Sequence, residues 1–170
     1  MNATATHSLD LLGGRTLGRF IMTMLFAGAL STVAFDYFGQ SLAPMLGWPN
    51  LAPVPLANQV LQVVFGWPGG YAPGAHFLHY AAGLLAYPLG WMLIVEPLRR
   101  AYAPQIHWLL AAALYGVALW VFALFVMASL IAGNPPFLGF IPLTWVALAG
   151  HVLFALVTAI VDRRDAPAGV

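Results

Sequence analysis

The sequence predicts an all-α membrane protein with four transmembrane helices in an up-down bundle, and two observations lead to that fold class. Hydrophobic residues make up 62% of the 170 residues and charged residues only 6%, whereas a soluble domain has roughly a quarter charged residues. The apolar residues also fall into four runs, and each run reaches the length of about 20 residues that a bilayer span needs. We therefore expect residues 1–170 to form a single integral membrane domain.

The basic residues predict how the chain is oriented. All six are arginines, and each lies at the same end of an apolar run. They form three pairs, which are Arg15 with Arg19, Arg99 with Arg100, and Arg163 with Arg164. Basic side chains accumulate on the cytoplasmic face, where anionic headgroups hold them. The pattern predicts a multi-pass protein of a bacterial inner membrane, with both termini and the connection between spans two and three in the cytoplasm.

The first span is expected at residues 17–42, and the connection after it is the only long one. The apolar run exceeds the length of a signal-peptide core, so we expect this segment to stay in the protein. Residues 45–74 are rich in proline and glycine and form a periplasmic cap. Within them, residues 56–65 repeat apolar positions at helical spacing over a length too short to cross. They predict a helix lying in the membrane interface, flanked by the aromatic anchors Trp48, Trp67 and Tyr71.

The remaining spans are expected at residues 75–97, 105–131 and 141–161. Pro88 should kink the second span, because proline deletes a backbone hydrogen bond and crowds the preceding turn. The short connection at residues 133–136 predicts an antiparallel hairpin of spans three and four. Small residues recur four apart, which favours close helix packing in lipid; the series is Ala82, Ala86 and Gly90 on span two, with Ala112 and Gly116 on span three.

Ionisable residues at membrane depth are costly, so each is a candidate for function. At 1.5 Å per residue, Asp36 lies roughly 25 Å from the cytoplasmic edge, and His79 lies at a similar depth on span two. His76 is one helical turn away from His79. Two imidazoles and one carboxylate suit zinc, iron or copper, but the same residues also suit a structural or proton-linked Asp–His pair without a metal. A third alternative is that they make no contact.

His151 should lie close to the middle of the membrane, at a depth shared by polar residues of the other spans. Those residues are Thr32 on span one, Tyr87 on span two and Tyr115 on span three. We expect His151 to bond to a tyrosine hydroxyl or to Thr32. It would then be either a neutral residue that sets helix register or a site for a quinone, a substrate or a proton. Haem is not expected, since His79 and His151 differ by roughly 9 Å in depth.

Charged and aromatic residues at the cytoplasmic edge are expected to anchor the helices, with partial ion pairing. They are Glu96, Arg99 and Arg100 after span two, His107 and Trp108 before span three, and Asp162 and Arg163 after span four. The chain has no cysteine, which excludes disulfides and thiolate metal sites. It also carries no phosphate-binding loop, nucleophile elbow or dinucleotide fingerprint. These absences favour a non-enzymatic protein without a cofactor, and leave enzyme activity as an open alternative.

Two segments, HYAAG at residues 79–83 and GHVLFAL at residues 150–156, resemble a pattern in small bacterial inner-membrane proteins of the YagU-like kind. Those proteins carry a His-x-x-aromatic or His-x-x-x-Gly turn in short membrane helices. The resemblance implies a polytopic inner-membrane protein with no enzyme chemistry to transfer. The long cap at residues 45–74 departs from that pattern.

Three functions fit these features. The first is a non-enzymatic accessory or partner-binding subunit, with the lipid bilayer and another membrane protein, or a second copy of the chain, as partners. The second is a small transporter or proton-linked protein that uses His151, Asp36 and His79. The third is a metal- or quinone-dependent redox protein. A net charge of only +1 gives no indication of nucleic-acid binding.

Overall fold

The computed structural model describes residues 11–67 and 69–166, and this part of the chain is helical, without strands. Four of its helices are long and apolar enough to cross a membrane. We call them spans one to four, and they are Leu17–Met45, Ala72–Tyr102, Trp108–Ile131 and Pro142–Asp165. The predicted all-α membrane fold is confirmed. The expectation for the two termini concerns residues 1–10 and 167–170, which lie outside the described residues.

Three of the spans are divided into segments because π-helical turns interrupt them. Span one consists of α1 (Leu17–Tyr37), η1 (Phe38–Leu42) and α2 (Ala43–Met45). Span two consists of α4 (Ala72–Ala81), η2 (Ala82–Ala86), α5 (Tyr87–Gly90), η3 (Trp91–Val95) and α6 (Glu96–Tyr102). Span three consists of α7 (Trp108–Val121) and η4 (Phe122–Ile131), and span four is α8 (Pro142–Asp165). Outside the spans lie α3 (Pro53–Phe65) and the 3₁₀ turn η5 (Pro136–Phe140).

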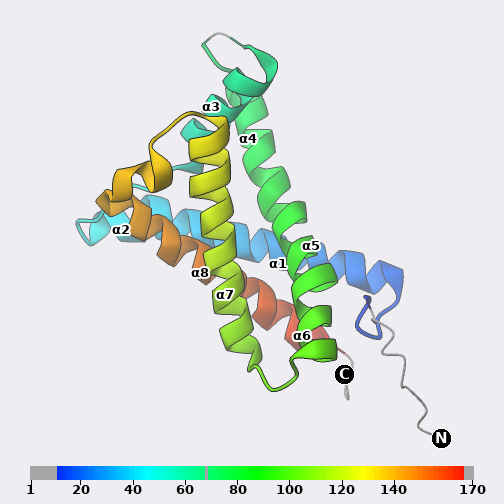
Figure 1. The fold of residues 1–170 in the computed structure, drawn as a ribbon. Coiled ribbons are helices and arrows are strands. Elements are labelled where there is room, and N and C mark those ends of the chain that lie inside the picture. Colours follow the sequence, from blue (N-terminus) through cyan, green and yellow to red (C-terminus); the bar gives the residue numbers. More distant parts are fainter. Residues whose placement is uncertain (1–10, 68, 167–170) are drawn as a thin grey trace, which may run out of the picture.

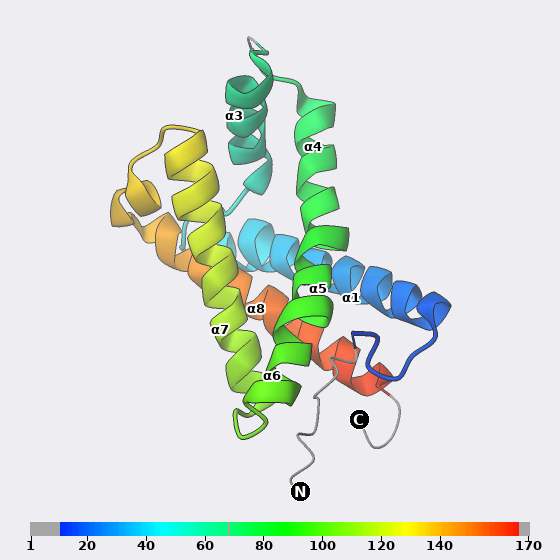
Figure 2. The same cartoon turned by 45° about the vertical axis from the view of Figure 1, so that its right-hand side comes forward.

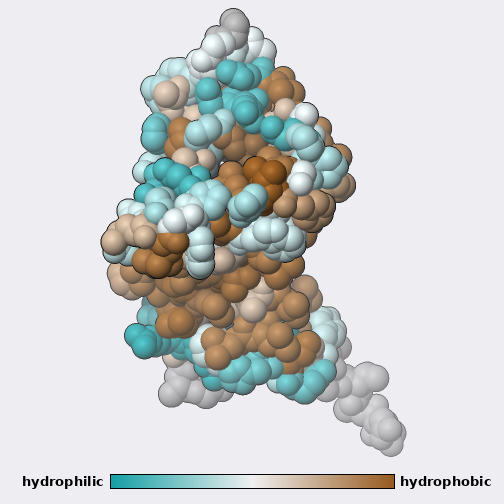
Figure 3. Space-filling view, turned by 90° about the vertical axis from the view of Figure 1, so that its left-hand side faces the viewer, coloured by the Kyte–Doolittle hydropathy of each residue, from teal (hydrophilic) through white to brown (hydrophobic). Residues whose placement is uncertain are grey.

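Span four is the centre of the bundle. It contacts α1 on one side and α7 on the other, while span two packs mainly on α1. In Figures 1 and 2, α1 and α8 lie side by side, and span two and α7 cross them at a steep angle. The most apolar stretch of span four is 56% buried inside the protein, against 22% for span two. Span two therefore exposes most of its surface. On the face of the molecule at the left-hand side of Figure 1, Figure 3 shows a hydrophobic region between more hydrophilic ends.

Glycines set the two closest helix crossings. A Cβ atom on Gly28 of α1 would lie 2.6 Å from the Leu84 carbonyl oxygen, and one on Gly116 of α7 would lie 2.5 Å from the Cα of Val152. The small-residue prediction is thus confirmed for span three, where Ala112 is also fully buried. On span two it fails at Ala86, which is exposed, and holds at Gly90, which lies against the Tyr115 hydroxyl of span three. The backbone of span two comes closest to α1 at Gly83 and Leu84, whose carbonyl oxygens lie against Gly28.

Each π turn in spans one and two ends two residues before a proline. The turn η1 ends at Leu42 and precedes Pro44, η2 precedes Pro88, and η3 precedes Pro97. Proline has no N–H and its ring crowds the carbonyl four residues earlier. A wider turn accommodates both effects, so the disturbance expected at Pro88 takes the form of a π turn that is repeated at two other prolines.

The predicted helix of the cap is confirmed and begins three residues earlier than expected, at Pro53. It packs against α4 and η4, and Figure 2 shows it running alongside α4. Two hydrogen bonds hold it there. The Tyr71 backbone N–H donates to Asn58 Oδ1 at 2.8 Å, and Asn134 Nδ2 donates to Gln59 Oε1 at 2.9 Å. The helix α3 therefore lies between the ends of spans two and three that are far from the six arginines. We call these the outer ends of the spans.

Candidate functional site

Asp36 of α1 and His79 of α4 form a polar pair in the outer part of the bundle. His79 Nε2 lies 3.1 Å from both carboxylate oxygens. The Asp36 side chain is 22% exposed and the His79 side chain 12% exposed. Asp36 precedes the end of span one by nine residues and His79 follows the start of span two by seven, which places both roughly 10–14 Å inside the outer end. The two residues meet at equal depth, as the sequence predicts.

His76 does not join this pair. Its side chain is exposed, and its ring stacks near Tyr80 with the centroids 6.3 Å apart. The contact of α4 with Asp36 is made by His79, whereas the ring contact of His76 is with Tyr80 of its own helix. Across residues 11–67 and 69–166, no group of three His, Cys, Asp or Glu side chains is arranged to hold a metal ion. The three-residue metal set considered from the sequence is therefore not assembled.

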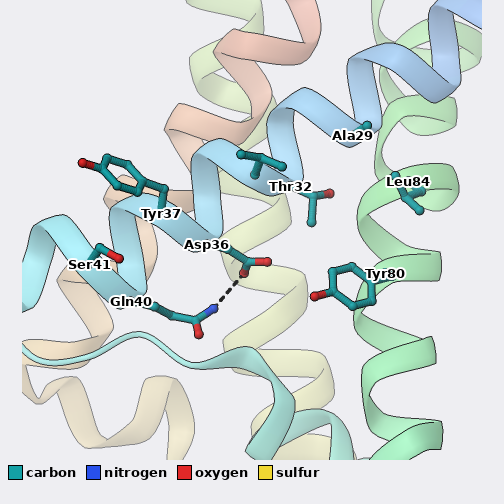
Figure 4. A pocket seen from close by; sticks show the side chains of 9 residues that line it. Ala29, Thr32, Asp36, Tyr37, Gln40, Ser41, Tyr80 and Leu84 are labelled. Carbon is teal, nitrogen blue, oxygen red and sulfur yellow. Dashed lines mark hydrogen bonds between the residues drawn. The ribbon is translucent and has the colours of Figure 1, made fainter.

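The pair borders an open pocket of about 510 Å³ between α1 and span two, which we call the outer pocket. Its lining residues are Ala29, Thr32, Val33, Asp36, Tyr37, Gln40, Ser41, Tyr80 and Leu84. Gln40 Nε2 donates to Asp36 Oδ1 at 3.1 Å. Figure 4 shows this bond, with the Tyr80 hydroxyl pointing across the pocket towards α1. The π turns η1 and η2 border the pocket, and such turns are frequent at functional sites.

The chemistry of the outer pocket follows from its side chains. Asp36 accepts hydrogen bonds from Gln40 and His79, so its carboxylate is held in one orientation. An imidazole next to a carboxylate can hold or release a proton. The carbonyl oxygen of Gln40 and the hydroxyls of Tyr80 and Ser41 make no hydrogen bond within the described part of the chain. The pocket therefore offers both donors and acceptors to a group that enters from the side.

His151 is buried, and the expectation of a bond to a tyrosine hydroxyl or to Thr32 is wrong. Its Nδ1 lies 2.7 Å from the carbonyl oxygen of Ala147, one turn earlier in the same helix. A carbonyl oxygen only accepts, so Nδ1 carries the proton. The Phe35 ring packs edge-on against the imidazole with centroids 5.1 Å apart, and Tyr87 lies at 6.4 Å. Its own helix therefore supplies the hydrogen bond of Nδ1.

The other residues of the expected central layer bond elsewhere. The Tyr115 hydroxyl donates to the Tyr87 carbonyl oxygen at 2.6 Å, which ties span three to span two. The Thr32 hydroxyl is buried without a hydrogen-bond partner in the described chain and lies against Gly83. The four residues share a depth without forming one hydrogen-bonded network.

Phe35 also separates the two histidines. Its ring centroid is 6.5 Å from that of His79 and 5.1 Å from that of His151. Within the described residues, no hydrogen bond joins His79 to His151, and the contact between their surroundings is the apolar ring of Phe35.

The sequence does not reveal a buried charge cluster at the end that holds the six arginines, which we call the inner end. The Arg15 side chain is only 2% exposed and lies 2.8 Å from Asp162 Oδ1 and 3.0 Å from Asp165 Oδ2. Trp91 Nε1 donates to Asp162 Oδ2 at 3.1 Å, and Arg19 pairs with Asp165. The start of span one and the end of span four therefore lie together. The sequence feature that could predict this cluster is the presence of opposite charges, Arg15 and Arg19 before span one and Asp162 and Asp165 at the end of span four, at the same membrane edge.

The fold and the polar pair define this chain as a multi-pass α-helical membrane protein with a lateral pocket in its outer half. No family model, no curated protein and no solved structure matches the chain. The resemblance to YagU-like proteins stays a prediction.

Proposed function

We propose that this chain is a non-enzymatic, partner-binding subunit of a membrane complex, and that the partner docks at the outer pocket. The observation that supports this proposal is the direction in which the pocket opens. A hydrogen-bonded carboxylate and imidazole, with the half-bonded Gln40, lie on the side of the bundle at membrane depth. That side faces lipid in an isolated chain.

Polar groups that face hydrocarbon are costly, because lipid offers them no hydrogen bonds. A membrane helix that carries a hydrogen-bonding side chain removes this cost when it covers the pocket. The rim suits such a helix, since Val33 and Tyr37 are 64% and 62% exposed and provide apolar and aromatic contact area. We infer that the partner is another membrane protein that presents a polar side chain at the depth of Asp36.

The proposed location is a bacterial inner membrane with both termini in the cytoplasm. The grouping of all six arginines at one end supports it, because the cytoplasmic side of such membranes gathers basic residues. The ion pairs of Arg15 with Asp162 and Asp165 agree with termini on one side.

The test is purification from native membranes in a mild detergent, with mass spectrometry of the proteins that accompany the chain. Gln40→Trp fills the outer pocket and should remove the partner. Phe26→Trp is the matched control, because Phe26 is 63% exposed on the same helix and does not line the pocket. It should retain the partner. A partner that survives Gln40→Trp, or the purification of wild-type chain alone, contradicts the proposal.

A proton-linked transporter is the second candidate, and the Asp36–His79 pair favours it. The Asp36 carboxylate lines the open pocket and is bonded to the His79 imidazole, so the pair can exchange a proton with the outer side. The chain reconstituted in vesicles, with a pH-sensitive dye inside and an imposed potential, would then conduct protons, and Asp36→Asn would abolish the flux. Phe35 between the two imidazoles counts against a path through one chain, so the leading proposal predicts no flux.

A further inference from the structure

A second cleft lies at the inner end, where spans two, three and four come together. It has a volume of about 430 Å³, and we call it the inner cleft. Its lining residues include Arg99, Arg100 and Arg163, with His107 and Trp108 from the start of α7. These residues come from three spans, so the cleft exists only in the folded chain. It is distant from the outer pocket and has no part in the proposed function.

The three arginines differ in how many of their donors remain available. Arg99 is committed, because Nε and Nη2 bond to Glu96 at 2.7 and 2.8 Å and Nη1 bonds to the Ile106 carbonyl oxygen at 3.1 Å. Arg100 uses only Nε, which bonds to Glu96 at 2.7 Å. Both of its terminal nitrogens are left for a ligand.

Arg163 has no carboxylate partner among the described residues. Its guanidinium lies 5.2 Å above the centre of the Trp108 ring, which holds the group in place while leaving its donors open. Arginine presents these donors as a planar fork that matches the oxygens of a phosphate group. The cleft thus contains one pre-positioned guanidinium and a second that is half committed.

Charge and local dipoles in the cleft also favour an anion. The lining of the cleft holds three guanidinium groups and no carboxylate. Glu96 pairs with Arg99 and Arg100, and Asp162 interacts electrostatically with Arg100. Arg163 therefore adds a positive charge that no carboxylate of the described chain pairs with. The backbone N–H of Leu109 donates to His107 Nδ1 at 3.3 Å, so the proton of the neutral imidazole is on Nε2, which is a further donor. The cleft adjoins the N-terminus of the 14-residue α7, the positive end of its helix dipole.

We propose that the inner cleft binds one phosphate group through Arg100 and Arg163, and that an anionic phospholipid headgroup supplies it. The position at the edge of three membrane spans favours a lipid over a soluble phosphate. The headgroup then matches the positive charge of Arg163, which has no carboxylate partner among the described residues.

The test uses the full chain in nanodiscs that contain phosphatidylglycerol and phosphatidylcholine in equal amounts. After release into detergent, native mass spectrometry counts the retained lipids. We expect one phosphatidylglycerol per chain. Arg163→Gln breaks no ion pair of the described chain and should weaken retention about fivefold to tenfold. Arg163→Lys should restore part of it.

Arg164→Gln is the matched control, since Arg164 carries the same charge at the next position and does not line the cleft. It should retain the lipid like the wild type. An equal loss in Arg164→Gln would overturn the proposal, because it would show general attraction to an anionic surface. Unchanged retention in Arg163→Gln would also overturn it. A parallel titration with inorganic phosphate distinguishes the sources: displacement of lipid at millimolar phosphate would contradict a lipid ligand and assign the cleft to free phosphate.

Discussion

Gly28→Ala should separate spans one and two, because the backbones of α1 and η2 touch at this residue. The new Cβ would lie 2.6 Å from the Leu84 carbonyl oxygen and 2.8 Å from the Gly83 carbonyl oxygen. Ordinary contacts begin at 3.4 Å, so the two helices would have to move apart by about 0.8 Å, the difference between 3.4 and 2.6 Å. Backbone atoms cannot rotate away as a side chain can.

The expected magnitude comes from two opposing effects. Overpacking of this kind costs about 1–3 kcal/mol, whereas alanine is more favourable than glycine inside a helix by about 0.5–1 kcal/mol. We expect a net loss of about 1–2 kcal/mol in the free energy of unfolding. The assay is SDS titration of the purified protein in detergent micelles, followed by the fluorescence of its six tryptophans.

Gly18→Ala is the matched control, because Gly18 lies in the same helix and a Cβ there would meet nothing within 4 Å. It should stabilise the protein by about 0.5–1 kcal/mol. Equal stabilisation by both substitutions would refute the close helix crossing at Gly28.

The other predictions concern the buried polar contacts that join spans one and four. Arg15→Gln should lower the free energy of unfolding by about 3–5 kcal/mol, because it leaves Asp162 as a buried charge without its partner; Arg164→Gln should change it little, and the same SDS titration compares them. Ser31 Oγ and Thr158 Oγ1 lie 2.8 Å apart and are fully buried, so a double-mutant cycle with Ser31→Ala and Thr158→Val should give a coupling energy of about 0.6 kcal/mol, up to about 1.7. A coupling of zero would contradict that interhelical bond.

The sequence predicts the features that depend on composition and on position along the membrane normal. The four spans, the cap helix and the meeting of Asp36 with His79 all follow from hydropathy and helical rise, because depth is a one-dimensional quantity. The ion pairs of Glu96 with Arg99 and Arg100 follow from helical spacing and are confirmed.

Features that depend on which faces meet could not be read from the sequence. The crossing at Gly28 requires knowledge of how each helix is rotated, and the π turns before the prolines shift that rotation along spans one and two. His151 satisfies itself within its own helix, which a comparison of depths cannot reveal. The grouping of the arginines identifies Arg15 only as a marker of orientation, although it is a buried partner of Asp162.

The most direct test of the partner-binding account is photo-cross-linking in native membranes. A photoreactive amino acid at position 40 lies in the outer pocket, and the same amino acid at position 26 faces lipid on the same helix. The account predicts a product with the mass of the chain plus one different membrane protein from position 40, and only lipid adducts from position 26. Lipid adducts alone from both positions, or a product with twice the mass of the chain, would contradict it.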